Sequence, residues 1–324
     1  MKKRNFLVTA VFAVIVYVFM AHATSLAADK ITVTDDAKRK VEIPAKPQRI
    51  VVLNSSNLEL LYAVGGQAIG RPESTGMPEY LATKVKHLPS VGETPNPNIE
   101  KIVSLAPDLV IGVNVMFHHA IIPPLEKAKI PVLLLSINSY KDILDKLRFY
   151  GEITGNNKKA VEIISRIEKK VSVIKKTVSS YKPPRVVIIW GSPQSFNMAL
   201  KNSFVGNLVE MLGGINIADD AKPLQSMPQY APLSLEYVLA KKPDMIFLIT
   251  HGNDEKVAEK FKKEIEEHPA WKGLDAVRAG RVHVLPYQLF GVNPAVRVTE
   301  AIEHISHLLY PEMSKATKQK GKVL

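Results

Sequence analysis

Two stretches of the sequence repeat one pattern at an offset of 136 residues. Residues 98–113 read NIEKIVSLAPDLVIGV, and residues 234–249 read SLEYVLAKKPDMIFLI. Each copy has a glutamate near its start, then Pro-Asp, and then a run of apolar residues. We expect a short helix before each proline, because proline disfavours helix in the residue that precedes it. The apolar runs are typical of strands covered on both faces of a parallel sheet. The repeat therefore predicts two α/β lobes of similar build.

The rest of the chain alternates between strand and helix patterns, as expected for doubly wound parallel sheets. Uninterrupted apolar runs predict buried strands, and apolar residues spaced three and four apart predict helices. We expect a hairpin over 31–44, strands at 49–54, 131–135, 185–191 and 245–250, and a helix over 139–154.

Residues 157–180 differ from both halves, because one helical pattern continues through all of them. Its apolar stripe consists of Ala160, Ile163, Ile164, Ile167, Val171 and Ile174. About 24 helical residues span ~36 Å, which exceeds most helices of compact domains. A new strand follows, so this helix is predicted to connect the lobes. The expected fold class is α/β, with two doubly wound lobes with parallel sheets, residues 28–156 and 181–312, joined by one long backbone helix.

The first 27 residues have the pattern of a secretory signal peptide. After Met-Lys-Lys-Arg and Asn5 come the fifteen uncharged residues 6–20, and four residues later Ser-Leu-Ala at residues 25–27. The stretch is short for a membrane span, which needs ~20 apolar residues, and retention as an anchor is the alternative. The chain contains no cysteine, which excludes disulfides, thiolate metal sites and a lipid-modified cysteine. We expect export to the periplasm, with residues 313–324 as a basic tail.

The charge balance is basic, with 43 Lys and Arg against 31 Asp and Glu. This excess is spread along the chain and forms no stripe of basic and aromatic residues of the kind that binds nucleic acid. The sequence also lacks a G-x-S-x-G elbow, a phosphate-binding loop and a G-x-G-x-x-G motif. We therefore expect neither a nucleic-acid partner nor an enzyme of these classes.

From about Ile31 to Pro311 the chain resembles bacterial substrate-binding proteins that feed ABC importers of ferric siderophores, haem and cobalamin. The motifs are RIVVLN…ELLYAVGG, VGETPNPNIEKIVSLAPDLVI, GEITGNNKKA, GNLVEMLGG, PLSLEYVLAKKPDMI and HPAWKGLDAVRAGRVHVL. The resemblance implies a protein without enzymatic activity or catalytic cofactor. Its two α/β lobes, joined by a single backbone helix, would hold an iron complex between them. We expect this protein to be a monomer.

The resemblance also implies a role for the repeated glutamates. In cobalamin- and siderophore-binding members, one exposed glutamate in each lobe docks onto arginines of the dimeric permease, and Glu100 and Glu236 match these positions. Two similar lobes would then face two similar permease subunits. The structural alternative is a solvated acidic residue in the first turn of a helix, where negative charge is favoured in any protein.

The second half of the chain is most similar to haem-receiving proteins of iron-regulated surface systems. GSPQSFNMALKNSFVGNLVEMLGG, THGNDEKV and FGVNPAV carry this likeness. It implies that His251, at the end of a predicted strand, is an axial ligand of haem iron. The methionine that those proteins supply from the other lobe is replaced by Pro95. Met77 is the nearest substitute along the chain, and His118 and His119 are further candidates.

Other residues near predicted strand ends suit a flat ligand with acidic groups. They are the aromatic residues Trp190, Phe196, Tyr230 and Phe290 for the flat face and Arg297 for the acidic groups, and Asn54 is a further candidate at a strand end. The alternative for Trp190 is an ordinary core position, and for Met77, His118 and His119 it is packing or a place on the surface. The predicted function is capture of an iron complex, with haem first, for delivery to an importer. The alternatives are a ferric-siderophore or cobalamin receptor, a zinc or manganese receptor, and a metal chelatase-like enzyme on a similar scaffold.

Overall fold

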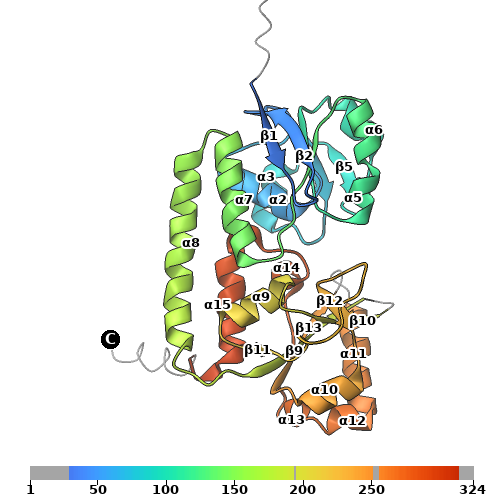
Figure 1. Ribbon diagram of the computed structural model, residues 1–324, viewed down its shortest axis with the longest axis vertical. Helices are drawn as coiled ribbons and strands as arrows, with labels where there is room; N and C mark the ends of the chain where they lie inside the picture. The colour runs from blue at the N-terminus through green and yellow to red at the C-terminus, as the bar shows by residue number, and fades with distance from the viewer. Residues whose placement is uncertain (1–28, 193–194, 251–254, 314–324) are drawn as a thin grey trace, which may run out of the picture.

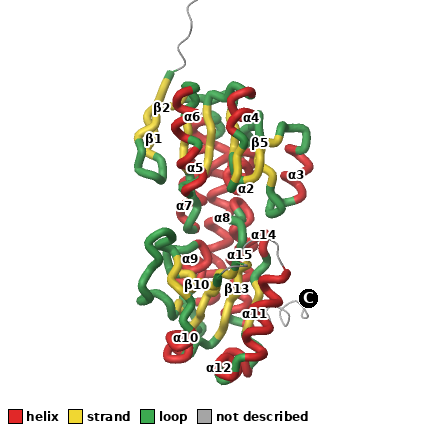
Figure 2. Tube along the Cα trace, turned by 90° about the vertical axis from the view of Figure 1, so that its right-hand side faces the viewer, coloured by secondary structure: helices red, strands yellow, loops and turns green. Residues whose placement is uncertain are grey.

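The computed structural model describes residues 29–192, 195–250 and 255–313 (Figure 1). Two lobes lie one above the other, and the long helix α8 (Asn157–Val178) runs beside both of them. Figure 2, turned by 90°, shows two separate groups of strands, one in each lobe, with helices around them. The chain thus forms two α/β lobes, as the repeat predicts.

The N-terminal lobe is built on a parallel sheet with the order β3-β7-β8, which pairs Val51 with Val110 and Val110 with Val132. A smaller sheet, β4-β5-β6, adjoins it through a bridge between Val51 and Gly70. The antiparallel hairpin β1–β2 precedes both sheets, as expected. The strands are β1 (Lys30–Thr34), β2 (Lys40–Pro44), β3 (Ile50–Val52), β4 (Arg71–Glu73), β5 (Ser90–Glu93), β6 (Asn96–Pro97), β7 (Leu109–Gly112) and β8 (Val132–Leu134). The helices are α2 (Ser55–Ala63), α3 (Glu79–Val85), α4 (Ile99–Ser104), α5 (Met116–Ala120), α6 (Ile122–Lys127) and α7 (Tyr140–Ile153).

The sheet of the C-terminal lobe is mixed, and β6 of the N-terminal lobe is antiparallel to β5. The prediction of parallel sheets was therefore wrong for these two sheets. The order in the C-terminal sheet is β12-β10-β9-β13-β14, with β11 pairing β9, and β10 and β12 are antiparallel to their neighbours. Only four residues separate β9 from β10, which is too short for the crossover that a parallel pair needs. The strands are β9 (Arg185–Gly191), β10 (Phe196–Ala199), β11 (Ile215–Asn216), β12 (Tyr230–Pro232), β13 (Met245–Thr250) and β14 (Val282–Val284). The helices are α9 (Phe204–Met211), α10 (Leu235–Lys241), α11 (Glu255–Glu267), α12 (Pro269–Lys272), α13 (Asp275–Arg278), α14 (Tyr287–Phe290), the 3-10 turn η1 (Ala295–Arg297) and α15 (Val298–Leu309).

The repeated motif forms the same unit in both lobes. A short helix, α4 or α10, leads into a fully buried strand, β7 or β13. Each helix begins at a residue whose side chain accepts a hydrogen bond from the third following N–H, Asn98 in one lobe and Ser234 in the other. Such caps satisfy N–H groups that a helix end leaves unpaired.

A matched Arg–Asp pair extends this repeat beyond the motif. The Asp108 carboxylate accepts the backbone N–H of Arg49 at 2.9 Å, and the Asp244 carboxylate accepts that of Arg185 at 2.7 Å. The Arg49 guanidinium donates to the carbonyls of Leu105 and Ala106, and that of Arg185 donates to the carbonyl of Lys241. The two arginines are also 136 residues apart. Each lobe therefore holds the end of its short helix against the start of a central strand by the same contacts.

Helix α8 packs one apolar stripe against the rest of the molecule. Five of the six expected stripe residues are buried, and the sixth, Ile174, is partly buried against the same core. Its 22 residues correspond to ~33 Å of helix. No helix in the described part of the chain is long and apolar enough to cross a membrane. The predicted signal peptide, residues 1–27, and the tail beyond Met313 lie outside the described residues.

A second connection between the lobes lies next to α8. The segment between α14 and α15 returns to the N-terminal lobe, where η1 packs against α2. Ser56 Oγ donates to the Asn293 carbonyl at 2.8 Å, and Asn293 Nδ2 donates to the Ile137 carbonyl at 3.3 Å. The Tyr140 N–H donates to Asn207 Oδ1 at 3.0 Å. Polar contacts at the junction therefore join the lobes in addition to the long helix.

Candidate functional site

The candidate site lies where the strands of the two lobes end. Strands β3, β7 and β8 are parallel, so their carboxyl ends share one edge, and Ser56 at this edge bonds to Asn293 of the other lobe. In the C-terminal lobe, β9 and β13 are parallel and end side by side at Gly191 and Thr250. We call these the facing edges of the two sheets (Figure 1). Ligands of open α/β sheets bind at such carboxyl ends.

Trp190 and Tyr230 form an aromatic pair beside the C-terminal facing edge. Their ring centroids are 5.4 Å apart at an interplanar angle of 42°, and both side chains are half-buried. Trp190 is the next-to-last residue of β9, and Tyr230 begins β12 on the far side of β10. Burial raises the pKa of the Tyr230 phenol, so this group is a neutral hydroxyl at physiological pH. The pair offers two inclined aromatic faces, one ring carrying an indole N–H and the other a phenol hydroxyl.

Two other predicted aromatic residues are engaged in packing. The Phe196 ring lies 5.2 Å from that of Phe261 on α11 and remains half-buried next to Gly191. Phe290 is only 6% exposed, and its ring lies 5.7 Å from that of His304. Phe196 is thus near the facing edge, whereas Phe290 belongs to the core in this structure.

Asn54 lies at the N-terminal facing edge, where β3 passes into α2. Its Oδ1 accepts a hydrogen bond from Asn57 Nδ2 at 2.8 Å, and the same nitrogen donates to the Leu135 carbonyl at 2.8 Å. These bonds join the start of α2 to the end of β8. The Asn54 side chain is half-buried, so a ligand at the edge could contact it, and its hydrogen bond with Asn57 fixes its orientation.

Arg297 is paired within the protein, at the junction of the lobes. Its Nε lies 3.3 Å from Glu59 Oε1, and its guanidinium also donates to the Gln288 carbonyl at 3.2 Å. Tyr80 donates to the same Glu59 oxygen at 2.6 Å. Burial raises the pKa of the Glu59 carboxyl, against the hydrogen bond from Tyr80 and the charge of Arg297. In this structure Arg297 therefore neutralises a buried glutamate, and a ligand would have to compete for it.

The predicted iron ligands have different surroundings. Met77 is 8% exposed and belongs to the core of the N-terminal lobe, so its thioether would have to leave that core to reach iron. His118 is fully buried and uses both ring nitrogens, accepting from the Val113 N–H and bonding the Thr94 carbonyl. His119 is exposed and bonds Asn114 Oδ1 at 2.7 Å. His251 lies outside the described residues.

The structure adds two residues that the sequence interpretation did not select. Met116 is 83% exposed and Phe117 is 37% exposed, both on α5, which follows β7 and its facing edge. The sequence feature that could have indicated them is the segment MFHHA directly after a buried strand. The sequence interpretation selected the two histidines of this segment instead. The buried Glu59 was also missed, because a single glutamate in a helix pattern gives no sign of its partner in the other lobe.

Glu100 and Glu236 occupy equivalent positions, each exposed in the first turn of its helix, α4 or α10. Neither glutamate forms an ion pair among the described residues. The first turn of a helix favours a carboxylate, and an exposed unpaired carboxylate can accept two hydrogen bonds from arginine. The two lobes thus present equivalent acidic groups.

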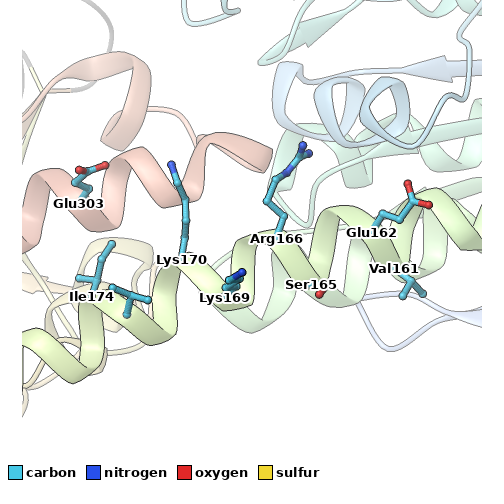
Figure 3. Close-up of a pocket in the computed structure, with 9 residues that line it drawn as sticks. Val161, Glu162, Ser165, Arg166, Lys169, Lys170, Ile174 and Glu303 are labelled. Carbon is cyan, nitrogen blue, oxygen red and sulfur yellow. The ribbon is translucent and has the colours of Figure 1, made fainter.

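A groove elsewhere on the molecule has a different composition (Figure 3). It measures about 770 Å³ and follows the outer side of α8, where Arg166, Lys169 and Lys170 line it together with Glu303 of α15. Its lining contains no aromatic residue, histidine or methionine, so it offers neither stacking surface nor iron ligands. Within the described ranges there is also no group of three or more His, Asp or Glu that would hold a metal ion. A zinc or manganese receptor therefore has no support from that part of the chain.

Two α/β lobes whose sheets meet at facing carboxyl edges suit a protein that binds a ligand between them. A family model described as periplasmic binding protein matches residues 50–289. The chain belongs to this family, so it is the substrate-binding component of an ABC importer in the iron-complex group, and a transport protein rather than an enzyme.

Relatives of known name agree with this assignment. The chain is 26% identical over 245 residues to the high-affinity heme uptake system protein IsdE of Staphylococcus aureus, which covers 75% of this chain and 81% of that protein. The crystal structure of S. aureus IsdE complexed with heme has a TM-score of 0.71 at 25% identity and covers 81% of this chain and 98% of that one. S. aureus SirA complexed with staphyloferrin B has a TM-score of 0.69 at 21% identity, over 86% and 98% of the two chains. This last likeness shows the shared fold alone.

Proposed function

We propose that the protein captures haem between its two facing edges and delivers it to a membrane permease. The observation that carries this proposal is the likeness to IsdE, which extends over most of both chains in sequence and in structure. The aromatic pair Trp190–Tyr230 supports it, because a macrocycle can stack on an aromatic face. Haem is the transported ligand here, not a catalytic cofactor.

We propose His251 as the iron ligand from the C-terminal lobe. It follows Thr250, the last residue of β13, at the carboxyl edge. A neutral imidazole is a suitable ligand for haem iron. Trp190, Tyr230 and Phe196 would flank the ligand from the same lobe, and Asn54 would meet it from the other.

Delivery would use the two equivalent glutamates. In this proposal residues 28–156 and 181–312 are the lobes, residues 157–180 are the connecting helix, and residues 1–27 direct export to the periplasm. Glu100 and Glu236 would pair with arginines of two permease subunits, in the charge-assisted bidentate geometry that carboxylates and guanidinium groups share. The α8 helix and the polar contacts at the junction would keep the closing motion of the lobes small.

A ferric siderophore is the second candidate ligand, and a specific observation favours it. Pro95 has no donor atom at the position where the resembling haem proteins supply methionine. The SirA likeness shows that this fold also occurs in a protein complexed with a siderophore. A cobalamin ligand belongs to the same group of alternatives.

Titration of the purified protein with haemin, cobalamin and several ferric siderophores distinguishes these ligands. We expect haemin to bind with a shifted Soret band, and we expect the His251→Ala variant to lose that shift. Binding of a siderophore without binding of haemin would reject haem as the ligand. A Soret shift that is unchanged in His251→Ala would reject the assigned iron ligand and leave haem in place.

A further inference from the structure

Helix α5 exposes two large apolar side chains at the N-terminal facing edge. Met116 is 83% exposed, the most of any large apolar residue in the described part of the chain, and Phe117 beside it is 37% exposed. Single exposed apolar residues are ordinary on protein surfaces, but two adjacent ones at the facing edge suggest a contact surface. What they could contact depends on where α5 is held.

Hydrogen bonds fix α5 at the ends of the strands. The segment between β7 and α5 is held by two backbone donors, the Val113 N–H to His118 Nδ1 and the Asn114 N–H to Ser136 Oγ, each at 2.9 Å. Ser136 follows the end of β8. The exposed side chains therefore stand at the same edge as the start of α2, which contacts the other lobe through Ser56.

His118 also joins α5 to the loop that contains Pro95. Its Nε2 lies 2.9 Å from the Thr94 carbonyl, and Thr94 Oγ1 donates to the Leu53 carbonyl at 2.9 Å. Because Val113 N–H donates to Nδ1, the ring is neutral with its proton on Nε2. The imidazole thus has no free nitrogen for a ligand. Its two bonds tie α5, which carries Met116 and Phe117, to the loop that contains Pro95.

We infer that Met116 and Phe117 are the contact of the N-terminal lobe with the bound iron complex, and that the Met116 thioether is a ligand of its iron. A thioether is a soft ligand that haem iron accepts. Methionine is unbranched and flexible, so an exposed side chain can adjust to a ligand that the other lobe holds. Phe117 would cover part of the macrocycle. This inference rests on the proposed function, because it requires an iron complex between the facing edges.

The test compares haemin binding by the purified wild-type protein with three variants. Met116→Ala removes the thioether and its packing, Met116→Leu keeps most of the packing without a good iron ligand, and Val173→Ala is the control. Val173 is 62% exposed on the outer side of α8, away from the facing edges. We expect Met116→Ala to weaken haemin binding about ten- to one-hundredfold, the effect of losing one buried methionine side chain.

The spectrum separates ligation from packing. We expect Met116→Leu to lose the far-red sulfur-to-iron charge-transfer band of the ferric complex, with a smaller loss of affinity than Met116→Ala, and Val173→Ala to match the wild type in both. If haemin binds the wild type and both Met116 variants with the same affinity and spectrum, the inference is wrong and the proposed function stands. If the wild type binds siderophores and no haemin, both the proposed function and the thioether ligand are rejected.

Discussion

Glu59 on α2 and Arg297 in η1 form an ion pair of 3.3 Å between the two lobes. The Glu59 side chain is 2% exposed and that of Arg297 is 14% exposed, so the pair is almost removed from water. Glu59 belongs to the N-terminal lobe and Arg297 to the C-terminal lobe, and both lie at the junction between them. The lobes are therefore coupled by a buried charge pair as well as by α8.

We predict that Arg297→Ala lowers the free energy of unfolding by about 3 kcal/mol, because it leaves a buried carboxylate without its cation. Urea denaturation at neutral pH measures this change. Arg278→Ala is the control, since its partner Asp275 and Arg278 itself are mostly exposed, and exposed pairs contribute about 1 kcal/mol or less. Equal effects of the two substitutions would show that Glu59 does not depend on Arg297. The double variant Glu59→Gln/Arg297→Ala should recover part of the loss.

The repeated Arg–Asp contacts predict parallel effects in the two lobes. Asp108 accepts the N–H groups of both Gln48 and Arg49, whereas among the described residues Asp244 accepts that of Arg185 alone. We expect Asp108→Ala and Asp244→Ala each to cost about 1–3 kcal/mol of stability, with the larger loss for Asp108. Thermal unfolding of both variants under one condition checks the order. A neutral result at either position would contradict the structural equivalence of the two units.

A pH-dependent contribution to stability is expected from His118. Burial lowers the pKa of its imidazole, with a smaller effect from the charge of His119. The unfolded chain therefore takes up a proton near pH ~6.5 that the folded chain resists. The contribution of His118 is fully present above that pH and is lost as pH falls through the lower folded pKa.

The difference in free energy of unfolding between wild type and His118→Ala isolates this contribution, because the other histidines contribute equally to both proteins. We expect the stability difference to be largest near neutral pH and to narrow steadily below pH ~6.5. His87→Ala is the control, since His87 is exposed, and it should match the wild type throughout. A difference that is constant with pH would mean that His118 titrates normally in the folded protein.

Charge reversal at the repeated glutamates tests docking. We predict that Glu100→Lys and Glu236→Lys each abolish uptake through the cognate importer while leaving ligand affinity unchanged, because the new cations would repel permease arginines. Glu79→Lys is matched to both, since Glu79 is also an exposed acidic residue in the first turn of a helix. Uptake assays in cells and titration of the purified variants give the two measurements. Loss of ligand affinity would instead place these glutamates in the binding site.

Much of the fold could be predicted because local patterns decide it. The repeated motif, the apolar strands and the stripe of α8 each depend on residues close together in the sequence, and the structure has all of them. The antiparallel strand β10 was missed because a strand of four residues that includes the polar Asn197 gives a weak apolar pattern. Extending the repeat outward would have revealed Arg49 and Arg185 at the same offset.

The site was harder to predict because it depends on contacts between distant segments. Arg297 was expected at the ligand, but its partner Glu59 lies 238 residues earlier, and no local pattern links them. His118 was selected by residue type, whereas its two bonds to Val113 and Thr94 give it a positioning role. The exposure of Met116 is likewise a property of the folded edge and not of its neighbours in sequence.

The most direct measurement is a crystal structure of the protein with haemin bound. The account predicts that the macrocycle lies between the facing edges, contacted by Trp190 and Tyr230 from one lobe and by Met116 and Phe117 from the other. Haemin in the groove outside α8, or held by one lobe alone with the opposite edge empty, would contradict it.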